Sequence, residues 1–385
     1  MSVSALPYWR ISSYYLFYFA ILGATVPYWN LYLLDIGFSP LEIGWITAIT
    51  LTVRIIAPNL WGWLADRSGQ RMAVVRWGMA LALGSFMLVA MDTRFVWIAV
   101  TLSLFSFFWN ACLAQFEANT MNHLADQNSR YGLLRLWGSI GFIAVVGGGG
   151  VLLERYGIGL LIPLVEILIV GALIASLLVP SHPGKPQDES QRPLLSVMKQ
   201  PKVILFLLVV VLMQASHGPY YTFFSIYLES LGYSRGLVGY LWALGVVAEV
   251  GVFILLARWL PILGVSRVLL FSMVLAALRW VLIGVAADSL VVLLIAQLLH
   301  AATFGAFHAA AIAHVHELFS GRNQGRGQAL FSSAGFGLGG ALGGLYSGYA
   351  WEGIGPSGTF LIAALLAAIG ALLALFFERP AQAIV

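Results

Sequence analysis

The sequence has few charged side chains and little else that a soluble protein needs on its surface. Charged residues make up 9% of the 385 residues, whereas soluble globular proteins have about 25%. Hydrophobic residues make up 60%, and the mean hydropathy is +0.90. One protein core cannot bury that much apolar surface, so we expect a chain whose surroundings are lipid.

The residues of common catalytic and metal sites are also scarce. Cys112 is the single cysteine, which excludes an internal disulfide and a cysteine metal cluster. The 7 histidines form no H-E-x-x-H pattern, and the acidic residues are scattered. We therefore expect no cofactor, no metal and no enzymatic activity. The net charge of +4 does not indicate nucleic acid, because the basic residues are sorted along the chain.

Long hydrophobic runs dominate the sequence. Windows of about 20 apolar residues predict twelve membrane-spanning helices, and one polar stretch, 180–202, divides them into six and six. We expect a six-helix bundle over 1–179, a cytoplasmic linker over 180–202 and a second bundle over 203–385. The predicted spans are 12–34, 42–64, 72–91, 95–122, 130–153, 157–179, 203–228, 236–257, 267–287, 289–314, 326–350 and 356–378.

The distribution of lysine and arginine predicts the orientation. With the N-terminus inside, 15 of the 20 basic residues fall at inner ends and loops, and only Arg94, Arg155 and Arg235 fall at outer ends. Arg54 and Arg279 lie within spans. Positive residues favour the cytoplasmic side, so both termini are expected in the cytoplasm. No cleavable signal peptide is apparent, because the first hydrophobic run is long enough to remain as a span.

The two halves of the chain repeat. LYLLDIGFSPLEIGW (31–45) aligns with IYLESLGYSRGLVGY (226–240) at a constant offset of 195 residues. Two parallel six-helix repeats are typical of transporters of the major facilitator type, which carry their substrate site between the repeats near the middle of the membrane. The identical pairs are Tyr32/Tyr227, Leu33/Leu228, Gly37/Gly232, Ser39/Ser234 and Gly44/Gly239.

A loop motif supports this architecture. GWLADRSGQR (62–71) resembles the G-x-L-A-D-R-x-G-x-R/K signature of the superfamily between spans 2 and 3. Glycine permits a tight turn, and an aspartate at a helix end can meet arginines or helix N-termini. We take five residues as a gating motif: Gly62, Asp66, Arg67, Gly69 and Arg71. A basic surface loop is the alternative interpretation.

Glu117 and Arg135 are charged residues within predicted spans 4 and 5. Each lies nine residues from the turn near Asp126, so in a helical hairpin the two have equal depth and can face each other. At an offset of 195 they correspond to Ile312 and Leu330, so the fold itself requires no charge there. A charge in the membrane costs about 2.5–3.5 kcal/mol, which favours a functional pair. Alternatively, Arg135 snorkels to the inner headgroups.

Charges lie at one equivalent depth in the two halves. Arg54 on span 2 corresponds to Glu249 on span 8, and a structural ion pair is the alternative to a functional role. On span 10, Gln297, His300, Phe304 and His308 share one helical face. A histidine there can carry a coupling proton or simply hydrogen-bond between helices.

Aromatic and polar side chains form stripes on two spans. Tyr14, Tyr18, Thr25, Tyr28 and Tyr32 follow one face of span 1, and Gln214, His217, Tyr221 and Ser225 follow one face of span 7. Tyrosine combines an apolar ring with a hydroxyl, which suits a small amphipathic substrate. An aromatic belt at the membrane surface also explains Tyr14 and Tyr32. The candidates for substrate binding are Glu117, Arg135, Tyr18, Tyr28, Tyr221, Trp242 and Asn110.

Three segments carry a more specific resemblance. YGLLRLWGSIGF, GYLWALGVVAEV and QLLHAATFGAFH resemble the phenylpropionate permease branch of the major facilitator superfamily, which is related to lactose permease and the nucleoside–proton symporters. The lactose permease pattern implies that Glu117 and Arg135 bind substrate and that Arg279 and His300 handle the proton. Where that pattern has a glutamate three residues after the histidine, this chain has Thr303. Glu249 matches the remaining carboxylate and becomes the candidate proton carrier.

The sequence thus predicts an all-α integral membrane protein of the major facilitator fold. We expect proton-coupled uptake of a small aromatic monocarboxylate across the cell inner membrane, by a protein that acts as a monomer. A sugar or nucleoside proton symporter, or efflux of small lipophilic compounds, is the alternative function. The expected partners are the substrate, protons and the lipid bilayer.

Overall fold

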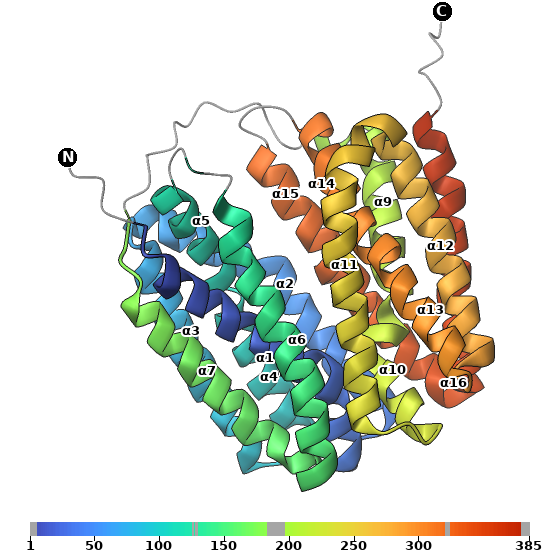
Figure 1. Ribbon diagram of the computed structural model, residues 1–385, viewed down its shortest axis with the longest axis horizontal. Coiled ribbons are helices and arrows are strands. Elements are labelled where there is room, and N and C mark those ends of the chain that lie inside the picture. Colours follow the sequence, from blue (N-terminus) through green and yellow to red (C-terminus); the bar gives the residue numbers. More distant parts are fainter. Residues whose placement is uncertain (1–5, 125–126, 128–129, 183–196, 320–323, 379–385) are drawn as a thin grey trace, which may run out of the picture. The chain divides into compact units, whose positions relative to one another are not determined.

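The computed structural model describes residues 6–124, 127, 130–182, 197–319 and 324–378, and in these ranges the regular structure is helical, without strands (Figure 1). Most of the predicted linker lies outside the described residues. Four of the basic residues counted at inner ends and loops also lie outside them: Lys185, Arg192, Arg322 and Arg379. Long apolar runs form helices because a helix satisfies its own backbone hydrogen bonds, which lipid cannot do.

The first half of the chain contains six spans, three of which are built from more than one element. Their elements are α1 (Tyr8–Asp35), α2 (Pro40–Ser68), α3 (Arg71–Met87) with the 3₁₀ turn η1 (Leu88–Met91), α4 (Phe95–Trp109) with α5 (Cys112–Leu124), α6 (Tyr131–Tyr156), and η3 (Ile158–Leu160) with α7 (Leu161–Leu178).

The second half has more interruptions, including two π-helical segments. Its elements are α9 (Pro201–Ser216), α10 (Gly218–Ser230), α11 (Arg235–Leu263), α12 (Val265–Ala286), α13 (Leu290–His300), the π-helix η4 (Ala301–Ala306), α14 (Phe307–Leu318), α15 (Gln324–Ser332), the π-helix η6 (Ser333–Gly339), α16 (Gly340–Ala374) and η7 (Leu375–Glu378). π-helical turns occur mostly within helices and often at functional sites.

The predicted count of twelve spans agrees with the helices. Within the described ranges, eleven helical stretches are long and apolar enough to cross a membrane, and the last of them, Gly325–Phe377, has 53 residues. A helix of that length extends about 80 Å at 1.5 Å per residue, far beyond the ~30 Å hydrocarbon layer. Gly355, with φ +76°, and the following Pro356 interrupt it and separate the eleventh span from the twelfth.

The chain forms two compact units. Unit 1 comprises Met1–Phe38, Thr52–Asp188 and Ser234–Tyr240, and unit 2 comprises Ser39–Leu51, Glu189–Tyr233 and Leu241–Val385. Each unit includes a short segment from the other half of the sequence, 39–51 in unit 2 and 234–240 in unit 1. Those two segments begin at positions that the 195-residue offset makes equivalent.

The internal repeat is visible at atomic detail in the turns after α1 and α10. Gly37 and Gly232 have φ values of +100° and +85°, which glycine adopts without a steric penalty. In each turn the next amide reaches back to a helix carbonyl, Phe38 to Leu33 at 3.0 Å and Tyr233 to Leu228 at 3.1 Å. This is a Schellman C-cap, and the repeat predicted from sequence is therefore present in the backbone.

The residues that follow these turns are also equivalent. The Ser39 hydroxyl accepts from the Glu42 amide at 3.2 Å, and the Ser234 hydroxyl accepts from the Leu237 amide at 3.2 Å. Both serines thus cap the N-terminus of the next helix.

Within unit 1, α1 packs against α6 and α7. The approach of α1 to α6 is close: a Cβ added at Gly141 lies 2.2 Å from the Leu16 carbonyl oxygen, and one at Gly23 lies 2.6 Å from the Phe142 carbonyl oxygen. Glycine at these positions removes the side chains that keep the backbones apart.

The C-terminus of α7 is capped by side chains of other helices. Arg76 donates to the carbonyls of Ser176 and Val179, at 3.3 and 2.9 Å. Arg10 and Asn119 donate to the carbonyls of residues 178 and 180. Cationic donors satisfy the last carbonyls of a helix and complement the negative end of its dipole.

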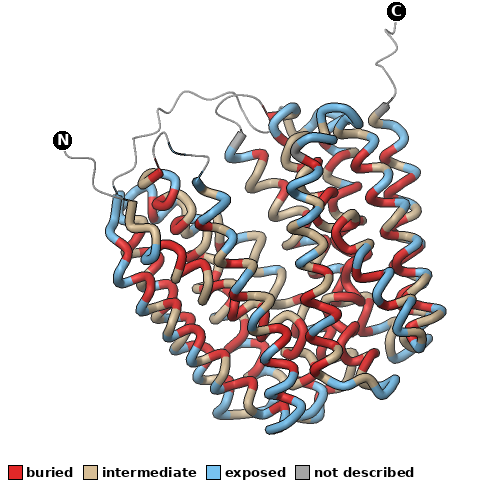
Figure 2. The backbone as a smooth tube through the Cα atoms, viewed as in Figure 1, coloured by how far each residue is buried: buried red, intermediate tan, exposed pale blue. Residues whose placement is uncertain are grey.

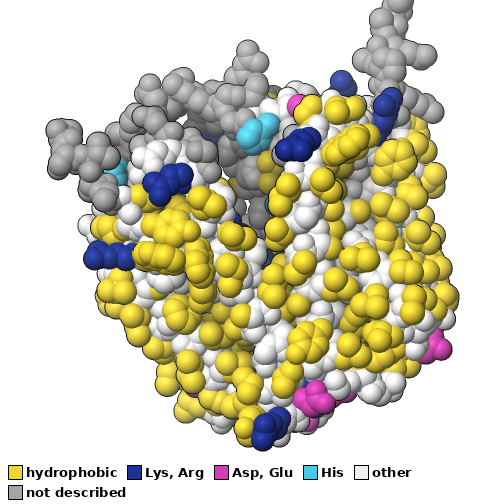
Figure 3. Space-filling model, viewed as in Figure 1, with side chains coloured by type: hydrophobic (Ala, Val, Ile, Leu, Met, Phe, Trp, Pro, Cys, Tyr) yellow, Lys and Arg dark blue, Asp and Glu magenta, His cyan; other side chains and the backbone are white. Residues whose placement is uncertain are grey.

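Buried and exposed residues alternate along the helices (Figure 2). Hydrophobic side chains cover the helix sides on the face shown in Figure 3, and charged side chains lie mostly near the helix ends. Many large apolar residues are exposed, including Ile56 at 65% and Val285 at 63%. Exposed apolar surface of this kind matches contact with lipid.

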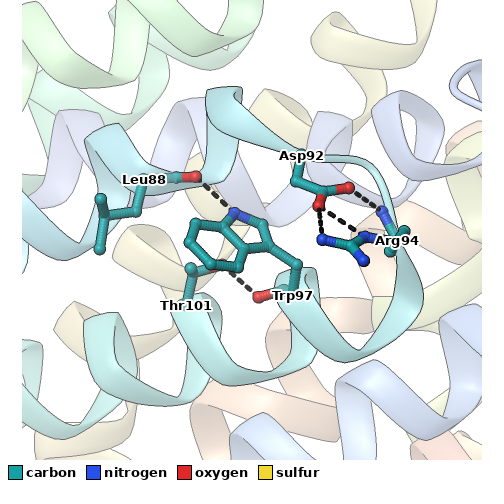
Figure 4. Close-up of polar contacts among 5 residues, drawn as sticks. All are labelled: Leu88, Asp92, Arg94, Trp97 and Thr101. Atoms are coloured by element: carbon teal, nitrogen blue, oxygen red, sulfur yellow. Dashed lines mark hydrogen bonds and ion pairs between the residues drawn. The ribbon is translucent and has the colours of Figure 1, made fainter.

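The turn between η1 and α4 is held by polar contacts (Figure 4). Asp92 accepts the Arg94 amide at 2.9 Å and the Arg94 Nε at 2.6 Å, and the Trp97 indole N–H donates to the Leu88 carbonyl at 2.7 Å. The hydrogen bond from the Arg94 side chain holds the pKa of the Asp92 carboxyl below its ordinary value of 3.8. The carboxylate form therefore stabilises this turn.

Candidate functional site

In unit 1, Glu117 on α5 and Arg135 on α6 face each other, as their equal distance from the turn between the helices predicted. The Arg135 Nε lies 3.5 Å from the Glu117 Oε1, and both side chains are 33% exposed. The Tyr131 hydroxyl, four residues before Arg135, donates to the same carboxylate oxygen at 3.2 Å. The contact predicted from sequence is present, and substrate binding by the pair stays a prediction.

Aromatic rings surround this pair. The Arg135 guanidinium lies over the Phe19 ring at 3.9 Å and over the Tyr15 ring at 5.4 Å. Such cation–π contacts stabilise an arginine by about 0.5–2 kcal/mol. The guanidinium rests against these rings while a third of its side chain is exposed, so it does not extend as a simple snorkelling anchor would.

The aromatic surface continues along α1. Tyr14 stacks on Phe116 with ring centroids 3.8 Å apart, and Tyr18 stacks on Trp109 at 4.0 Å. Tyr14 is fully buried, and its hydroxyl has no partner among the described residues. Tyr18, a predicted binding residue, is thus 4% exposed and packed within this aromatic layer.

Two other predicted binding residues of unit 1 have their polar groups occupied. The Tyr28 hydroxyl is fully buried and donates to the Val146 carbonyl at 2.6 Å. Asn110 lies at the break between α4 and α5 and donates to the Ser106 carbonyl at 2.7 Å. Tyr28 therefore ties α1 to α6, and Asn110 caps its own helix.

The gating motif has the predicted turn geometry. Gly69 has φ +65°, and Arg71 pairs with Asp66 at 3.1 Å. Arg67 lies over the ring of Trp63 at 5.4 Å, while a Cβ at Gly62 meets only the Gln115 side chain, at 3.9 Å. The local structure agrees with the signature, and the gating role stays a prediction.

In unit 2, three ionisable residues from three helices form a chain. The His300 Nε2 lies 2.6 Å from the Glu249 Oε1, and the His300 Nδ1 lies 2.8 Å from the Arg279 Nη1. Arg279 is 0% exposed and His300 is 4% exposed. The predicted proton-coupling set of Glu249, Arg279 and His300 is thus brought together.

Hydrogen-bond chemistry fixes the protons in this chain. A guanidinium only donates, so the His300 Nδ1 must accept from Arg279, and its proton must be on Nε2. The Nε2–H then donates to the Glu249 carboxylate. His300 is a neutral bridge between a fixed cation and an anion.

Thr303 stands where the lactose permease pattern has a glutamate. Its hydroxyl accepts from the Arg279 Nη1 at 3.3 Å and donates to the His300 carbonyl at 3.3 Å. This position therefore supplies a neutral acceptor to Arg279, and Glu249 on α11 supplies the negative charge.

Aromatic residues pack around the chain. The Arg279 guanidinium lies over the rings of Tyr220 and Trp280, at 4.2 and 4.5 Å. Trp242 is 3% exposed, and its indole N–H donates to the Ser225 hydroxyl at 3.0 Å. The ring centroid of Tyr221 lies 6.1 Å from that of Trp242 and 6.3 Å from that of Phe304.

The shared face predicted for span 10 is confirmed. The rings of His300 and Phe304 stack at 5.4 Å, and those of Phe304 and His308 at 6.1 Å. The Gln297 Oε1 accepts from the Tyr220 hydroxyl at 2.9 Å.

Sequence reasoning missed Tyr131 and Tyr220. Tyr131 lies one helical turn before Arg135, and its i, i+4 spacing was the available signal. Tyr220 precedes the predicted Tyr221 on α10 and lies outside the stripe of Gln214, His217, Tyr221 and Ser225, so the spacing of that stripe gave no signal for it.

Arg54 and Glu249 correspond through the internal repeat and lie in different units. The Arg54 Nε is buried and lacks a hydrogen-bond partner among the described residues. A structural ion pair between the two residues stays a prediction.

Known proteins resemble this chain in sequence and in fold. The model of the MFS_1 like family matches residues 8–362. A probable 3-phenylpropionic acid transporter of Escherichia coli (strain K12) is 28% identical, covering 97% of each chain. A maltose permease of Geobacillus stearothermophilus is 24% identical, covering 95% of this chain and 93% of that one.

The fold comparison agrees. The crystal structure of a mutant of the nucleoside transporter NupG superposes with a TM-score of 0.88, covering 96% of this chain and 99% of that one at 17% sequence identity. These relatives and structural neighbours are transporters rather than enzymes. The chain therefore belongs to the MFS_1 like family and is a multi-pass membrane transporter of the major facilitator superfamily.

Proposed function

We propose that the protein takes up a small aromatic monocarboxylate together with protons. The observation that carries this proposal is the setting of Arg135, a cation that is one third exposed, lies on aromatic rings and has a single loose carboxylate contact. The name of the Escherichia coli relative, a probable 3-phenylpropionic acid transporter, supports the same substrate class.

Arg135 suits a carboxylate for a geometric reason. A guanidinium binds a carboxylate through two parallel N–H···O bonds, and the Glu117 contact at 3.5 Å is longer than a good charge-assisted hydrogen bond. A substrate carboxylate can therefore form closer contacts with Arg135 while Tyr131 holds Glu117. The neighbouring rings of unit 1 supply an apolar surface for the aromatic part of the substrate.

Glu249 is the proposed proton carrier. Its carboxylate is the only negative charge in the Arg279–His300–Glu249 chain, and it accepts from the neutral His300. Protonation of Glu249 leaves the Arg279 charge without a balancing anion. The protonated and unprotonated states thus differ by a full charge in a buried cluster, which is the kind of difference that couples a proton to a conformational change.

The proposed setting is the cell inner membrane with both termini in the cytoplasm. The 15-to-3 distribution of basic residues between the predicted sides supports this orientation. We also propose that the monomer is the functional unit, because each unit carries its own polar cluster.

Uptake into proteoliposomes tests the substrate class. The protein is reconstituted and supplied with labelled aromatic acids, sugars and nucleosides, with and without an imposed pH gradient. Protein-free liposomes correct for diffusion of undissociated acid. We expect saturable uptake of aromatic acids that rises with an inward proton gradient. Uptake of sugars or nucleosides in preference to acids contradicts the proposal.

A sugar or nucleoside proton symporter is the second candidate. It is favoured by the sequence similarity to the maltose permease and by the fold similarity to NupG. In that case Glu117 and Arg135 hydrogen-bond hydroxyls rather than a carboxylate. The same uptake panel separates the two functions, and drug resistance in cells that express the protein indicates efflux instead.

A further inference from the structure

His217 in unit 2 has a polar atom that takes no part in the hydrogen bonds among Arg279, His300 and Glu249. It lies at the break between α9 and α10 and is 0% exposed. Its Nδ1 lies 2.9 Å from the Met213 carbonyl oxygen, and its Nε2 has no hydrogen-bond partner among the described residues.

The tautomer of His217 follows from this geometry. A backbone carbonyl only accepts, so the Nδ1 of His217 carries the proton. In the neutral ring the Nε2 is then a bare lone pair. This arrangement is opposite to that of His300, whose Nε2 carries the proton. His217 therefore offers an acceptor that only a hydrogen-bond donor can satisfy.

Aromatic side chains pack around His217. Its ring centroid lies 4.8 Å from that of Trp280, 6.0 Å from Tyr221 and 6.3 Å from Phe304. The Trp280 indole N–H is already used, because it donates to the Ser216 hydroxyl at 3.2 Å. A buried acceptor without a donor is costly, and this one lies among aromatic faces.

Neighbouring residues have buried hydrogen-bond donors that lack acceptors in the described part of the chain. The Nε and Nη2 of Arg279 and the Nε2 of Gln297 are buried donors with no acceptor among the described residues. Tyr220 connects them, because its ring covers Arg279 and its hydroxyl donates to Gln297. The cluster thus lacks both a donor for His217 and acceptors for its neighbours.

The unpaired acceptor of His217 and the unpaired donors beside it determine which ligand groups can bind there. A carboxylate has no proton to give to the Nε2 of His217. An ammonium group has protons, but the buried charge of Arg279 repels it. A hydroxyl both donates and accepts, and a phenol places its hydroxyl on an aromatic ring that packs well against other rings.

We propose that His217 is the specificity residue of a subsite in unit 2 that binds the hydroxyl of a ring-hydroxylated aromatic acid. This inference rests on the proposed function and narrows its substrate class. His217 accepts the phenolic proton through Nε2, and Trp280, Tyr221 and Phe304 pack on the ring.

Competition against labelled phenylpropionate uptake in proteoliposomes tests the subsite. The competitors are unlabelled phenylpropionates with either a hydroxyl or a fluorine at the same ring position. Fluorine is close to a hydroxyl in size and cannot donate. The wild type is expected to be inhibited by the hydroxyl compound at about fivefold to tenfold lower concentration than by the fluoro compound.

Three substitutions of His217 separate its two nitrogens. His217→Asn keeps a donor near the Nδ1 position and is too short to place an acceptor at the Nε2 position, and His217→Phe removes both groups, so each is expected to abolish the preference. His217→Gln can place an amide oxygen near the Nε2 position and should retain it. His314→Asn, a histidine that pairs with Glu317, is the matched control and should keep the wild-type ratio.

The outcomes are distinguishable. Because the measured quantity is a ratio within each variant, a lower yield of folded protein does not affect it. Without uptake of phenylpropionate by the wild type, the proposed function fails and the subsite fails with it. Uptake without a preference for the hydroxyl compound, or a preference that persists in His217→Asn and His217→Phe, means that internal water satisfies Nε2 and overturns the subsite alone.

Discussion

The Arg279–His300–Glu249 chain predicts an energetic coupling between two residues that do not touch each other directly. The two contacts of 2.8 and 2.6 Å and the width of the imidazole ring place the opposite charges about 7 Å apart. At an effective dielectric constant of about 20, this separation corresponds to roughly 2 kcal/mol. Removing either charge leaves the other buried and unbalanced.

A double-mutant cycle measures this coupling. Glu249→Gln and Arg279→Gln each keep a similar shape and a hydrogen-bonding amide. Each single change is expected to cost about 3–5 kcal/mol of stability, because breaking a buried pair leaves an uncompensated charge. The double variant removes both charges, so its loss should be about 2 kcal/mol smaller than the sum of the single losses.

Unfolding of the purified variants in detergent gives the four stabilities. The exposed pair of Asp66 and Arg71 provides a control cycle, whose coupling should be at most about 1 kcal/mol. In transport assays, Glu249→Gln should lose uphill uptake and keep exchange. Additive stability losses, within about 0.5 kcal/mol, would refute the neutral-bridge arrangement of charges.

Three further predictions concern unit 1. Arg135→Leu should lose binding of the aromatic acid in a direct binding assay, whereas Arg135→Lys should lose less; normal binding by both makes the residue a structural anchor. Gly141→Ala should cost about 1–3 kcal/mol in a detergent unfolding assay, because the new Cβ meets a backbone oxygen at 2.2 Å, whereas Gly148→Ala on the same helix meets nothing within 4 Å and should be close to neutral; equal effects contradict the close packing of α1 on α6. Because the pKa of Asp92 is lowered in the folded state, its stabilising contribution is present above pH ~4 and is lost as the pH falls through the folded-state pKa. The stability difference between wild type and Asp92→Asn should therefore shrink on acidification in thermal unfolding at a series of pH values, and a constant difference contradicts the Asp92–Arg94 contact.

Periodicity and spacing in the sequence predicted most of the fold. Hydrophobic length predicted twelve spans, and the 195-residue offset predicted equivalent structure at Gly37 and Gly232, where both turns have positive φ and the same backbone hydrogen bonds. These features depend on residues that are close together in the sequence, so they can be predicted from the sequence alone. The depth argument for Glu117 and Arg135 succeeded for the same reason, because a hairpin fixes depth.

The details of the site depend on helix rotation and on side-chain partners, which spacing does not determine. Tyr28 belongs to the predicted stripe, yet its hydroxyl bonds to the Val146 carbonyl. Thr303 marked a departure from the family pattern, but its role as a hydrogen-bond acceptor for Arg279 required coordinates. The opposite tautomers of His217 and His300 likewise follow only from the atoms that each ring nitrogen meets.

The most direct test of the account is a measurement of proton movement caused by the substrate. Proteoliposomes that contain a pH-sensitive dye receive an aromatic acid at equal internal and external pH, and protein-free liposomes give the background from diffusion of the undissociated acid. The account predicts that wild-type protein acidifies the interior faster than this background, in proportion to labelled acid taken up, and that Glu249→Gln does not. Protein-dependent uptake of the acid without protein-dependent acidification, or acidification unchanged in Glu249→Gln, would contradict it.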